Sequence, residues 1–111
     1  LLGALRKKDI GTIYPSNNSK FKNIRSSKML FPIVKSLNKD GYYINNIDIN
    51  LICEKPKVYK YRDKIISSLS NLLSIKKNQI NLKGKTVEKL GLIGKEKAIA
   101  CEALVCLNYY A

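Results

Sequence analysis

Apolar and polar residues follow two clear periods in the middle of the chain. Between residues 42 and 54, apolar side chains occupy alternate positions, at Ile47, Ile49, Leu51 and Cys53. A period of two is typical of a half-buried strand, which we place at about residues 42–54. Farther along, apolar residues recur at helical spacing, at Ile65, Ile66, Leu69, Leu72 and Leu73. This stripe predicts an amphipathic helix that opens near Asp63.

A second helix is predicted upstream, after the candidate N-cap residues Ser26 and Ser27. Its apolar residues have helical spacing and are Leu30, Ile33, Val34 and Leu37, with Gly41 where a C-terminal cap is expected. Pro32 conflicts with a helix interior, because proline has no backbone N–H to donate. The sequence therefore predicts that this helix starts late, so that Pro32 falls in its first turn.

The remaining segments are shorter. Residues 1–5 indicate the end of an apolar helix, and residues 9–19 a turn followed by a polar loop. Residues 80–85 predict a short strand, and residues 86–90 a loop that enters a single helical turn. Residues 98–110 are apolar on both faces, which predicts a buried strand.

The order of these elements predicts the fold class. Strands and helices alternate along the chain, and no internal repeat or linker interrupts them. We therefore expect an α+β fold (an α/β sandwich), with helices packed on one face of a mixed β-sheet. We expect a single domain over residues 1–111, since this length is close to the commonest domain size.

The chain is strongly basic, with a formal net charge of +13 from 21 Lys+Arg and 8 Asp+Glu. Such a charge can indicate a nucleic-acid-binding module, because basic side chains displace counterions from phosphates. The basic residues are scattered rather than gathered into one stripe, however, and the chain is rich in Lys, Asn, Ile and Tyr. A compositional bias therefore explains the charge better, although it still favours an anionic substrate.

Cysteine and histidine usage argues against a framework of disulfides or a self-contained zinc site. The three cysteines form no CxxC pair, and the chain has no histidine. No apolar run approaches the roughly 20 residues of a membrane span. The chain begins at Leu1 without a methionine, which we interpret as a truncation.

Two loops carry residues suited to phosphates. In residues 84–91, the hydroxyl of Thr86 and the carboxylate of Glu88 follow a predicted strand, and Glu88 could hold a divalent cation. An ordinary helix cap explains the same residues. In residues 53–57, Pro56 fixes a bend and Lys57 can face an anion, although a solvated basic turn is the commoner structure for such residues.

Glu102 stands out because it shares a strand face with Ala100, Leu104 and Cys106. A carboxylate within an apolar row needs a partner, because burying an unpaired charge is costly. We expect it to meet a cation across a subunit interface; the alternative is that this part of the strand is exposed.

Several motifs together resemble the 2-C-methyl-D-erythritol 2,4-cyclodiphosphate synthases. Each motif is weak alone, but their order and spacing along the whole chain are specific. They are Asp9-Ile10-Gly11 with Tyr14-Pro15 and Phe21-Lys22, then Pro56-Lys57, then Thr86-x-Glu88-Lys89-Leu90-Gly91, then Ile99-Ala100-Cys101-Glu102-Ala103.

The resemblance implies a homotrimer with active sites between subunits. It implies a phosphorus–oxygen lyase of the non-mevalonate isoprenoid pathway, which uses Zn²⁺ (or another divalent transition metal) and Mg²⁺ (or Mn²⁺). Its substrate would be a small cytidine diphosphate compound, 4-diphosphocytidyl-2-C-methyl-D-erythritol 2-phosphate, which is cyclised with release of CMP. Neither nucleic acid nor membrane is expected as a partner.

Roles carry over by position. Asp9 and Gly11 resemble the residues that grip the erythritol hydroxyls. The positions that match the cytidine and phosphate pocket are Cys53, Pro56, Lys57, Val58, Tyr59, Lys85 and Thr86. Glu88 matches the magnesium ligand, so that Thr86 and Glu88 are the expected catalytic residues. Lys95 and Glu102 match a polar pair near the central trimer cavity, and a contact between them would supply the cation that Glu102 needs.

The departures from the family concern metal and substrate. The resemblance implies an Asp-x-His pair and a second His as zinc ligands, and this chain contains none of them. Lys85 stands where a second phosphate-binding Thr is usual, Ser16 where an acid is common, and Arg25 in place of an acid before Ser26. This chain alone is therefore expected to be inactive.

Two alternatives remain beside the synthase. One is the basic nucleic-acid-binding module, supported only by net charge, and the other is an inactive trimerising fragment of the synthase. The pathway belongs to bacteria and plastids, so we expect either a bacterial cytoplasm or an apicoplast-like plastid.

Overall fold

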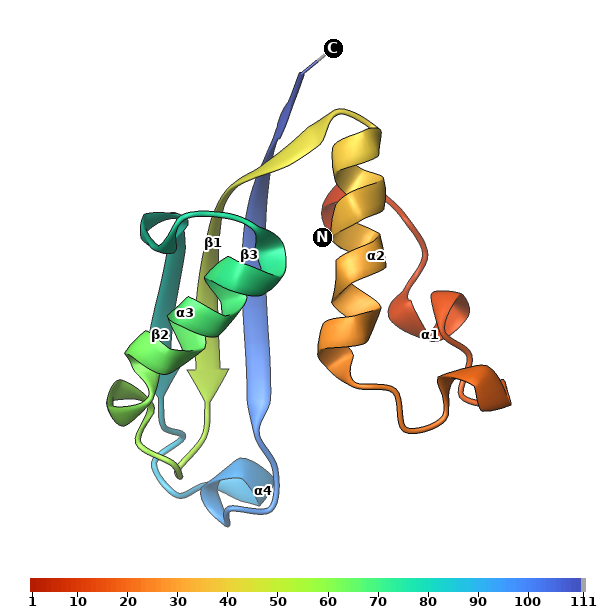
Figure 1. Cartoon of the computed structure of the whole chain (residues 1–111). Helices are drawn as coiled ribbons and strands as arrows, with labels where there is room; N and C mark the ends of the chain where they lie inside the picture. The colour runs from red at the N-terminus through yellow and green to blue at the C-terminus, as the bar shows by residue number, and fades with distance from the viewer. Residues whose placement is uncertain (111) are drawn as a thin grey trace.

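The computed structural model describes residues 1–110 and contains one sheet with helices beside it (Figure 1). The strands are β1 (Tyr42–Ile52), β2 (Ile80–Lys85) and β3 (Ala100–Tyr109). The helices are α1 (Ile10–Ile13), α2 (Ser26–Lys39), α3 (Arg62–Leu73) and α4 (Gly91–Gly94). Short 3₁₀ turns lie at Gly3–Leu5, Ser19–Phe21, Val58–Lys60 and Lys77–Gln79.

The sheet is mixed and has the strand order β2-β1-β3. β1 runs parallel to β2, with Ile49 opposite Leu82, and antiparallel to β3, with Ile49 opposite Ala103. The predicted α+β class is confirmed. The strand predicted at residues 42–54 is β1, and the one at residues 80–85 is β2.

The core lies between the two longer helices, α2 and α3, and the helix-facing side of β1 and β2, and Val34 of α2 belongs to it. Alternate β1 residues, such as Ile47 and Ile49, are buried together with Ile80 and Leu82 of β2. From α3, Ile66 and Leu73 are buried in the same cluster, whereas Ile65 and Leu69 are partly buried against it. The apolar side chains that recur every second residue in the strands thus pack against those that recur every 3.6 residues in the helices.

α2 corrects the prediction of a late helix start. It begins at Ser26, with Arg25 in the N-cap position, so Pro32 is an interior residue. Pro32 is exposed, whereas Val34 and Leu37 are buried, and this packing offsets the hydrogen bond that proline cannot donate. Gly41 follows the helix with φ of +89°, as expected for a glycine that ends a helix.

β3 corrects a second prediction, because within this chain it is not buried. It forms one edge of the sheet, and Leu104 is 77% exposed. Val105 and Leu107 are half-buried against the core, while Glu102 and Leu104 belong to the alternate set on the other face. The reason is that the helices pack on the other face of the sheet, so that no element of residues 1–110 covers Leu104. Residues 1–5 form a 3₁₀ turn rather than an α-helix end.

We expect Leu37→Ala to lower the free energy of unfolding by about 2–5 kcal/mol, since Leu37 is 1% exposed and its removal leaves a cavity. Urea unfolding of the 111-residue chain measures the change as a lower midpoint. Phe31→Ala in the same helix is the control, because Phe31 is 62% exposed and its loss is expected to change stability by less than about 0.5 kcal/mol. Equal effects of the two substitutions would contradict the observed packing of α2.

Candidate functional site

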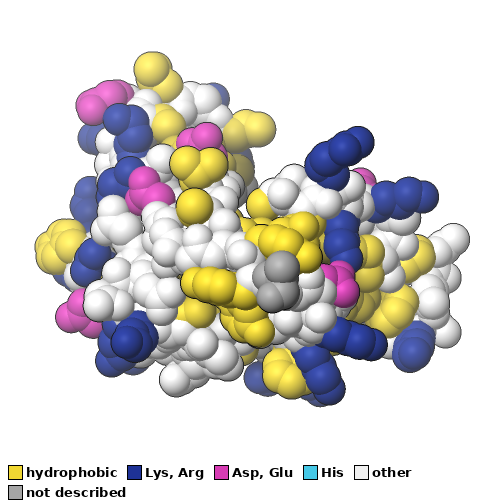
Figure 2. Space-filling view, turned by 90° about the horizontal axis from the view of Figure 1, so that it is seen from above, with side chains coloured by type: hydrophobic (Ala, Val, Ile, Leu, Met, Phe, Trp, Pro, Cys, Tyr) yellow, Lys and Arg dark blue, Asp and Glu magenta, His cyan; other side chains and the backbone are white. Residues whose placement is uncertain are grey.

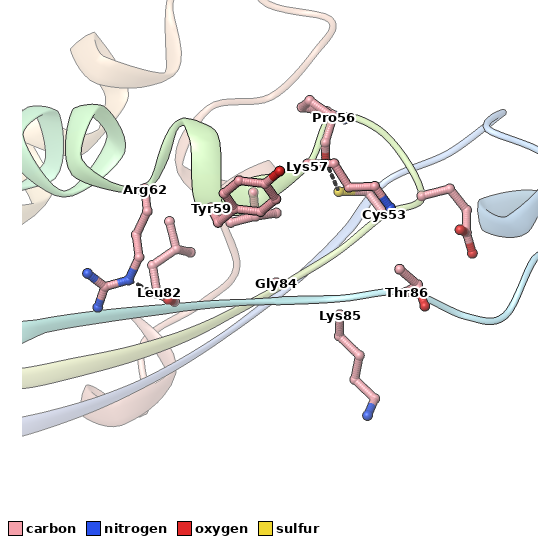
Figure 3. Close-up of a pocket in the computed structure, with 11 residues that line it drawn as sticks. Cys53, Pro56, Lys57, Tyr59, Arg62, Leu82, Gly84, Lys85 and Thr86 are labelled. Atoms are coloured by element: carbon pink, nitrogen blue, oxygen red, sulfur yellow. Dashed lines mark hydrogen bonds between the residues drawn. The ribbon is translucent and has the colours of Figure 1, made fainter.

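A cavity of about 240 Å³ opens where β1 and β2 end (Figure 3). Residues 53–59, which we call the nucleotide turn, form one wall, and the end of β2 forms the other. It is lined by Cys53, Glu54, Pro56, Lys57, Val58, Tyr59, Arg62, Leu82, Gly84, Lys85 and Thr86. Parallel pairing brings these walls together, since Ile52 lies opposite Lys85 and the Cys53 N–H donates to the Lys85 carbonyl at 3.0 Å.

The inner wall of the cavity depends on a small residue in β2. A Cβ on Gly84 would lie 2.7 Å from the Cβ of Val58, so the absent side chain lets the nucleotide turn pack directly on the strand. Cys53 and Val58 are buried, and the Cys53 thiol donates to the Pro56 carbonyl at 3.6 Å. The apolar wall is therefore fixed before any ligand binds.

Positive charge surrounds this wall. Lys57 is exposed in the nucleotide turn, and Arg62 lies at the start of α3. Arg62 donates from Nε to the Leu82 carbonyl and from Nη2 to Asn81 Oδ1, both at 3.1 Å. Neither acceptor is an anion, so these two contacts do not offset the positive charge of Arg62. Sequence reasoning missed Arg62, and only its position at the start of a predicted helix after a Lys-rich turn could have suggested it.

The segment after β2, residues 86–90, is held by Glu54, and we call it the phosphate loop. One oxygen of the Glu54 carboxylate, Oε1, accepts from the Val87 N–H at 3.1 Å and from the Lys89 N–H at 2.9 Å. The Lys89 amide is the main cause that lowers the pKa of Glu54, with smaller contributions from the Val87 amide and the charges of Lys57 and Lys89. Glu54 thus stays ionised over a wider pH range than a free glutamate.

The phosphate loop has an unusual backbone. Glu88 and Lys89 both have left-handed conformations, with φ of +55° and +61°. A residue that carries a Cβ loses about 1–2 kcal/mol of stability in this left-handed conformation. Contacts with other segments must therefore maintain the loop. One of these is Gly94 in α4, where a Cβ would lie 2.1 Å from the Lys89 carbonyl carbon.

The structure brings together most of the residues that the sequence proposed for the pocket. All seven positions matched to the cytidine and phosphate pocket line this one cavity. Glu88 lies two residues beyond Thr86 on the phosphate loop and is exposed. Lys85 contributes to the wall, but its side chain extends away from the nucleotide turn (Figure 3). Its ammonium group is therefore not directed at the cavity of its own chain.

Asp9 and Gly11 are not part of this cavity within the chain. Asp9 is the N-cap of α1 and accepts from the Thr12 N–H at 3.1 Å and from the Thr12 hydroxyl. The Thr12 hydroxyl is the main cause that lowers the pKa of Asp9. Figure 1 shows α1 beside α2, on the side of the molecule away from β2.

The contact predicted between Lys95 and Glu102 is one across a subunit interface, and it stays a prediction. Glu102 is exposed on β3, opposite Asn50 of β1, and the ion pairs of residues 1–110 do not include it. Lys95 follows α4, a separate short turn before the strand, and is also exposed. Within one chain, residues 1–110 show no ion pair between them.

Charge on the surface is dispersed. On the face shown in Figure 2, Lys and Arg side chains lie at several separate places, with apolar and acidic groups between them. Within residues 1–110, no helix is long and apolar enough to cross a membrane. In the same part of the chain, no group of three or more His, Cys, Asp or Glu side chains is placed to hold a metal ion.

A family model described as the YgbB family matches residues 1–108. The chain belongs to the YgbB family. A protein from Francisella tularensis subsp. novicida named 2-C-methyl-D-erythritol 2,4-cyclodiphosphate synthase is 44% identical over 109 residues, which are 98% of this chain and 68% of that protein. The family resemblance inferred from the motifs is thereby confirmed.

Other relatives are longer. A bifunctional enzyme IspD/IspF from Pelagibacter ubique is 53% identical over 104 residues, or 94% of this chain and 28% of its own length. An apicoplast synthase from Plasmodium falciparum is 45% identical over 107 residues, or 96% of this chain and 45% of its own length. The chain thus spans about a quarter to a half of these relatives.

The fold is shared with a solved structure described as IspF from Plasmodium falciparum in complex with CDP. That structure matches with a TM-score of 0.87 and 42% identity, over 99% of this chain and 65% of that one. The mixed sheet with its covering helices is therefore the arrangement found in the family.

We expect Gly94→Ala to lower the free energy of unfolding by about 1–3 kcal/mol, since the added Cβ would overlap the Lys89 backbone. Gly3→Ala is the matched control, because a Cβ on Gly3 meets nothing within 4 Å. Chemical denaturation of both variants measures the difference. A Gly94→Ala chain as stable as the Gly3→Ala chain would show that the close approach of α4 to the phosphate loop is not needed.

Proposed function

We propose that residues 1–111 are the C-terminal part of a cyclodiphosphate synthase domain. The whole enzyme would cyclise 4-diphosphocytidyl-2-C-methyl-D-erythritol 2-phosphate to 2-C-methyl-D-erythritol 2,4-cyclodiphosphate and release CMP, as a step of isoprenoid biosynthesis. The observation that carries this proposal is that the nucleotide turn and the end of β2, together with Thr86 of the phosphate loop, line one cavity. Support comes from the shared fold with a CDP complex.

The cavity suits a pyrimidine nucleotide. The buried wall of Cys53 and Val58 offers apolar contact to the base, and backbone groups of the nucleotide turn can hydrogen-bond its polar edge. Lys57 and Arg62 supply positive charge beside it, which favours the anionic diphosphate. The Thr86 hydroxyl, at the end of β2, would donate to a phosphate oxygen.

In this reaction an oxygen of the substrate's 2-phosphate attacks the β-phosphorus. The bond from the β-phosphorus to the oxygen bridging it to the α-phosphorus breaks, and CMP leaves with that oxygen. Holding both ends of one flexible molecule supplies much of the rate. The attacking phosphate and the β-phosphorus are then already close together, so that less entropy is lost in the reaction step. The nucleotide turn would fix the leaving group, and Thr86 would orient the phosphate under attack.

The residues present fit a magnesium ion, and do not fit zinc. Glu88 is an exposed carboxylate beside the phosphate loop's Thr86, and Mg²⁺ (or Mn²⁺) is commonly held by one or two carboxylates together with substrate phosphates. Such an ion would neutralise the crowded phosphate oxygens. Zn²⁺ (or another divalent transition metal) finds no ligand set among residues 1–110. Its ligands would have to come from outside the printed sequence.

A homotrimer with sites between subunits fits the arrangement of the chain. Asp9 and Gly11 lie away from the cavity of their own chain, so a neighbouring copy would bring them to it. The apolar side chain of Leu104, exposed on the outer face of β3, would be covered by other copies. Lys95 and Glu102 would then meet across the interface.

For the compartment we propose a bacterial cytoplasm or a plastid, since relatives include bacterial and apicoplast proteins.

We expect the 111-residue chain to bind CDP weakly and to release no CMP from the synthase substrate, because it has no zinc ligands. Calorimetric titration with CDP measures the first outcome, and CMP release in the presence of zinc and magnesium measures the second. A measurable rate would contradict the dependence on ligands outside the chain. Absence of CDP binding would instead favour an inactive trimerising fragment.

In the whole synthase we expect Glu88→Gln to raise the magnesium concentration needed for half-maximal activity by about tenfold, the effect of losing one charged ligand. The matched control is Glu96→Gln, which removes the same charge from a residue whose carboxylate contacts Lys55 at 3.6 Å. Unchanged magnesium dependence of the Glu88→Gln enzyme would remove Glu88 from the metal site.

A further inference from the structure

We propose that Glu54 is a positioning residue, which fixes the phosphate loop around Glu88 and ties it to the nucleotide turn. The inference rests on the proposed function, because it takes Thr86 and Glu88 as the groups that meet the diphosphate and its metal ion. The two amides that Glu54 binds belong to Val87 and Lys89, which flank Glu88 on both sides. The backbone of the expected metal ligand is therefore held at its two neighbours by a single carboxylate oxygen.

Glu54 is placed to connect two parts of the site. It lies two residues after the end of β1, within the nucleotide turn, and it lines the cavity. Its side chain reaches residues that lie 33 and 35 positions later in the sequence. A movement of either segment would break both hydrogen bonds, so the nucleotide turn and the phosphate loop are held in one arrangement.

Other contacts within residues 1–110 hold this region less directly. The Leu90 N–H donates to the Val87 carbonyl at 3.1 Å, which closes the phosphate loop on itself but does not attach it to β1. Lys55 and Glu96 form an ion pair at 3.6 Å, with side chains 74% and 48% exposed. Exposed pairs of this kind contribute little to stability. Glu54 is thus the main polar connection between the two segments.

The charge of Glu54 argues for this role. A carboxylate beside a diphosphate site repels the ligand, so its presence is unfavourable for anion binding by itself. Charged acceptors form stronger hydrogen bonds to amides than neutral ones do. An oxygen that binds two amides at once can maintain the consecutive left-handed residues Glu88 and Lys89 against their backbone strain. We infer that the hydrogen bonds by which Glu54 orders the phosphate loop outweigh its repulsion of the diphosphate.

Two substitutions at one position separate charge from hydrogen bonding. Glu54→Ala and Glu54→Gln both remove one negative charge, but only the glutamine keeps a carbonyl oxygen where Oε1 stands. Glu96→Ala removes the same charge from the neighbouring ion pair and leaves the loop's amides untouched. Each variant of the 111-residue chain is first compared with the wild type by urea unfolding. Amide exchange and ligand affinity are then measured only on variants that are folded.

The structural measurement is amide hydrogen exchange of Val87 and Lys89, followed by NMR. We expect exchange of both amides to become at least about tenfold faster in Glu54→Ala, with most of the protection kept in Glu54→Gln and all of it in Glu96→Ala. Unchanged exchange in Glu54→Ala would overturn the proposal. This measurement requires no ligand, and so it decides the structural role even if CDP does not bind.

The functional measurement compares CDP with magnesium against cytidine, which has no phosphate. In Glu54→Ala we expect the affinity for CDP to fall about tenfold, the size of one lost charge-assisted hydrogen bond, and that for cytidine to change less than about twofold. Glu54→Gln should restore most of the CDP affinity. Equal CDP affinities in the alanine and glutamine variants would show that Glu54 acts through charge, and would overturn the positioning role. A wild-type chain that binds neither ligand would contradict the nucleotide pocket proposed for this chain, whereas the exchange measurement would still decide the structural role of Glu54.

Discussion

The parallel pairing of β1 with β2 is the constraint on which the site depends. Parallel strands end at the same edge of a sheet, so the chain leaves Ile52 and Lys85 as neighbours although they lie far apart in the sequence. The hydrogen bond from the Cys53 N–H to the Lys85 carbonyl extends this pairing by one step beyond β1. The nucleotide turn and the phosphate loop then start from adjacent points, and the cavity lies between the nucleotide turn and the end of β2, with Thr86 in its lining.

Packing above the sheet keeps these two segments in place. Val58 rests on the bare backbone of Gly84, and Arg62 reaches from α3 to the Leu82 carbonyl and to Asn81. α3 is itself fixed by Ile66 and Leu73 in the core. Apolar burial that stabilises the fold therefore also fixes the wall of the site. No residue of the phosphate loop is fully buried, and its left-handed residues are held by Glu54 and by the close approach of Gly94 to Lys89.

Much of the fold could be predicted from periodicity. β2 has the predicted bounds, β1 ends two residues before the predicted end, and α3 begins one residue before Asp63. The errors concern burial and context. Pro32 was expected near a helix start, but packing of Val34 and Leu37 keeps it inside α2. The strand at residues 98–110 was expected to be buried because it is apolar on both faces, but β3 is an edge strand of this chain. The spacing of apolar residues indicates which side chains favour burial. It does not indicate whether another element of the same chain buries them.

Most of the helices and strands could be predicted from the sequence alone, because they depend on the local spacing of apolar residues. The family and the residues of the nucleotide pocket could also be predicted, because they depend on motifs in a specific order. Tertiary structure decided which of those residues meet. It placed Cys53 and Thr86 at one cavity and turned the Lys85 side chain away from it. It also gave roles to Arg62 and Glu54, which no motif indicated. The physical reason is that hydrogen bonds between distant segments depend on strand order and register, and these are set by the packing of the whole chain.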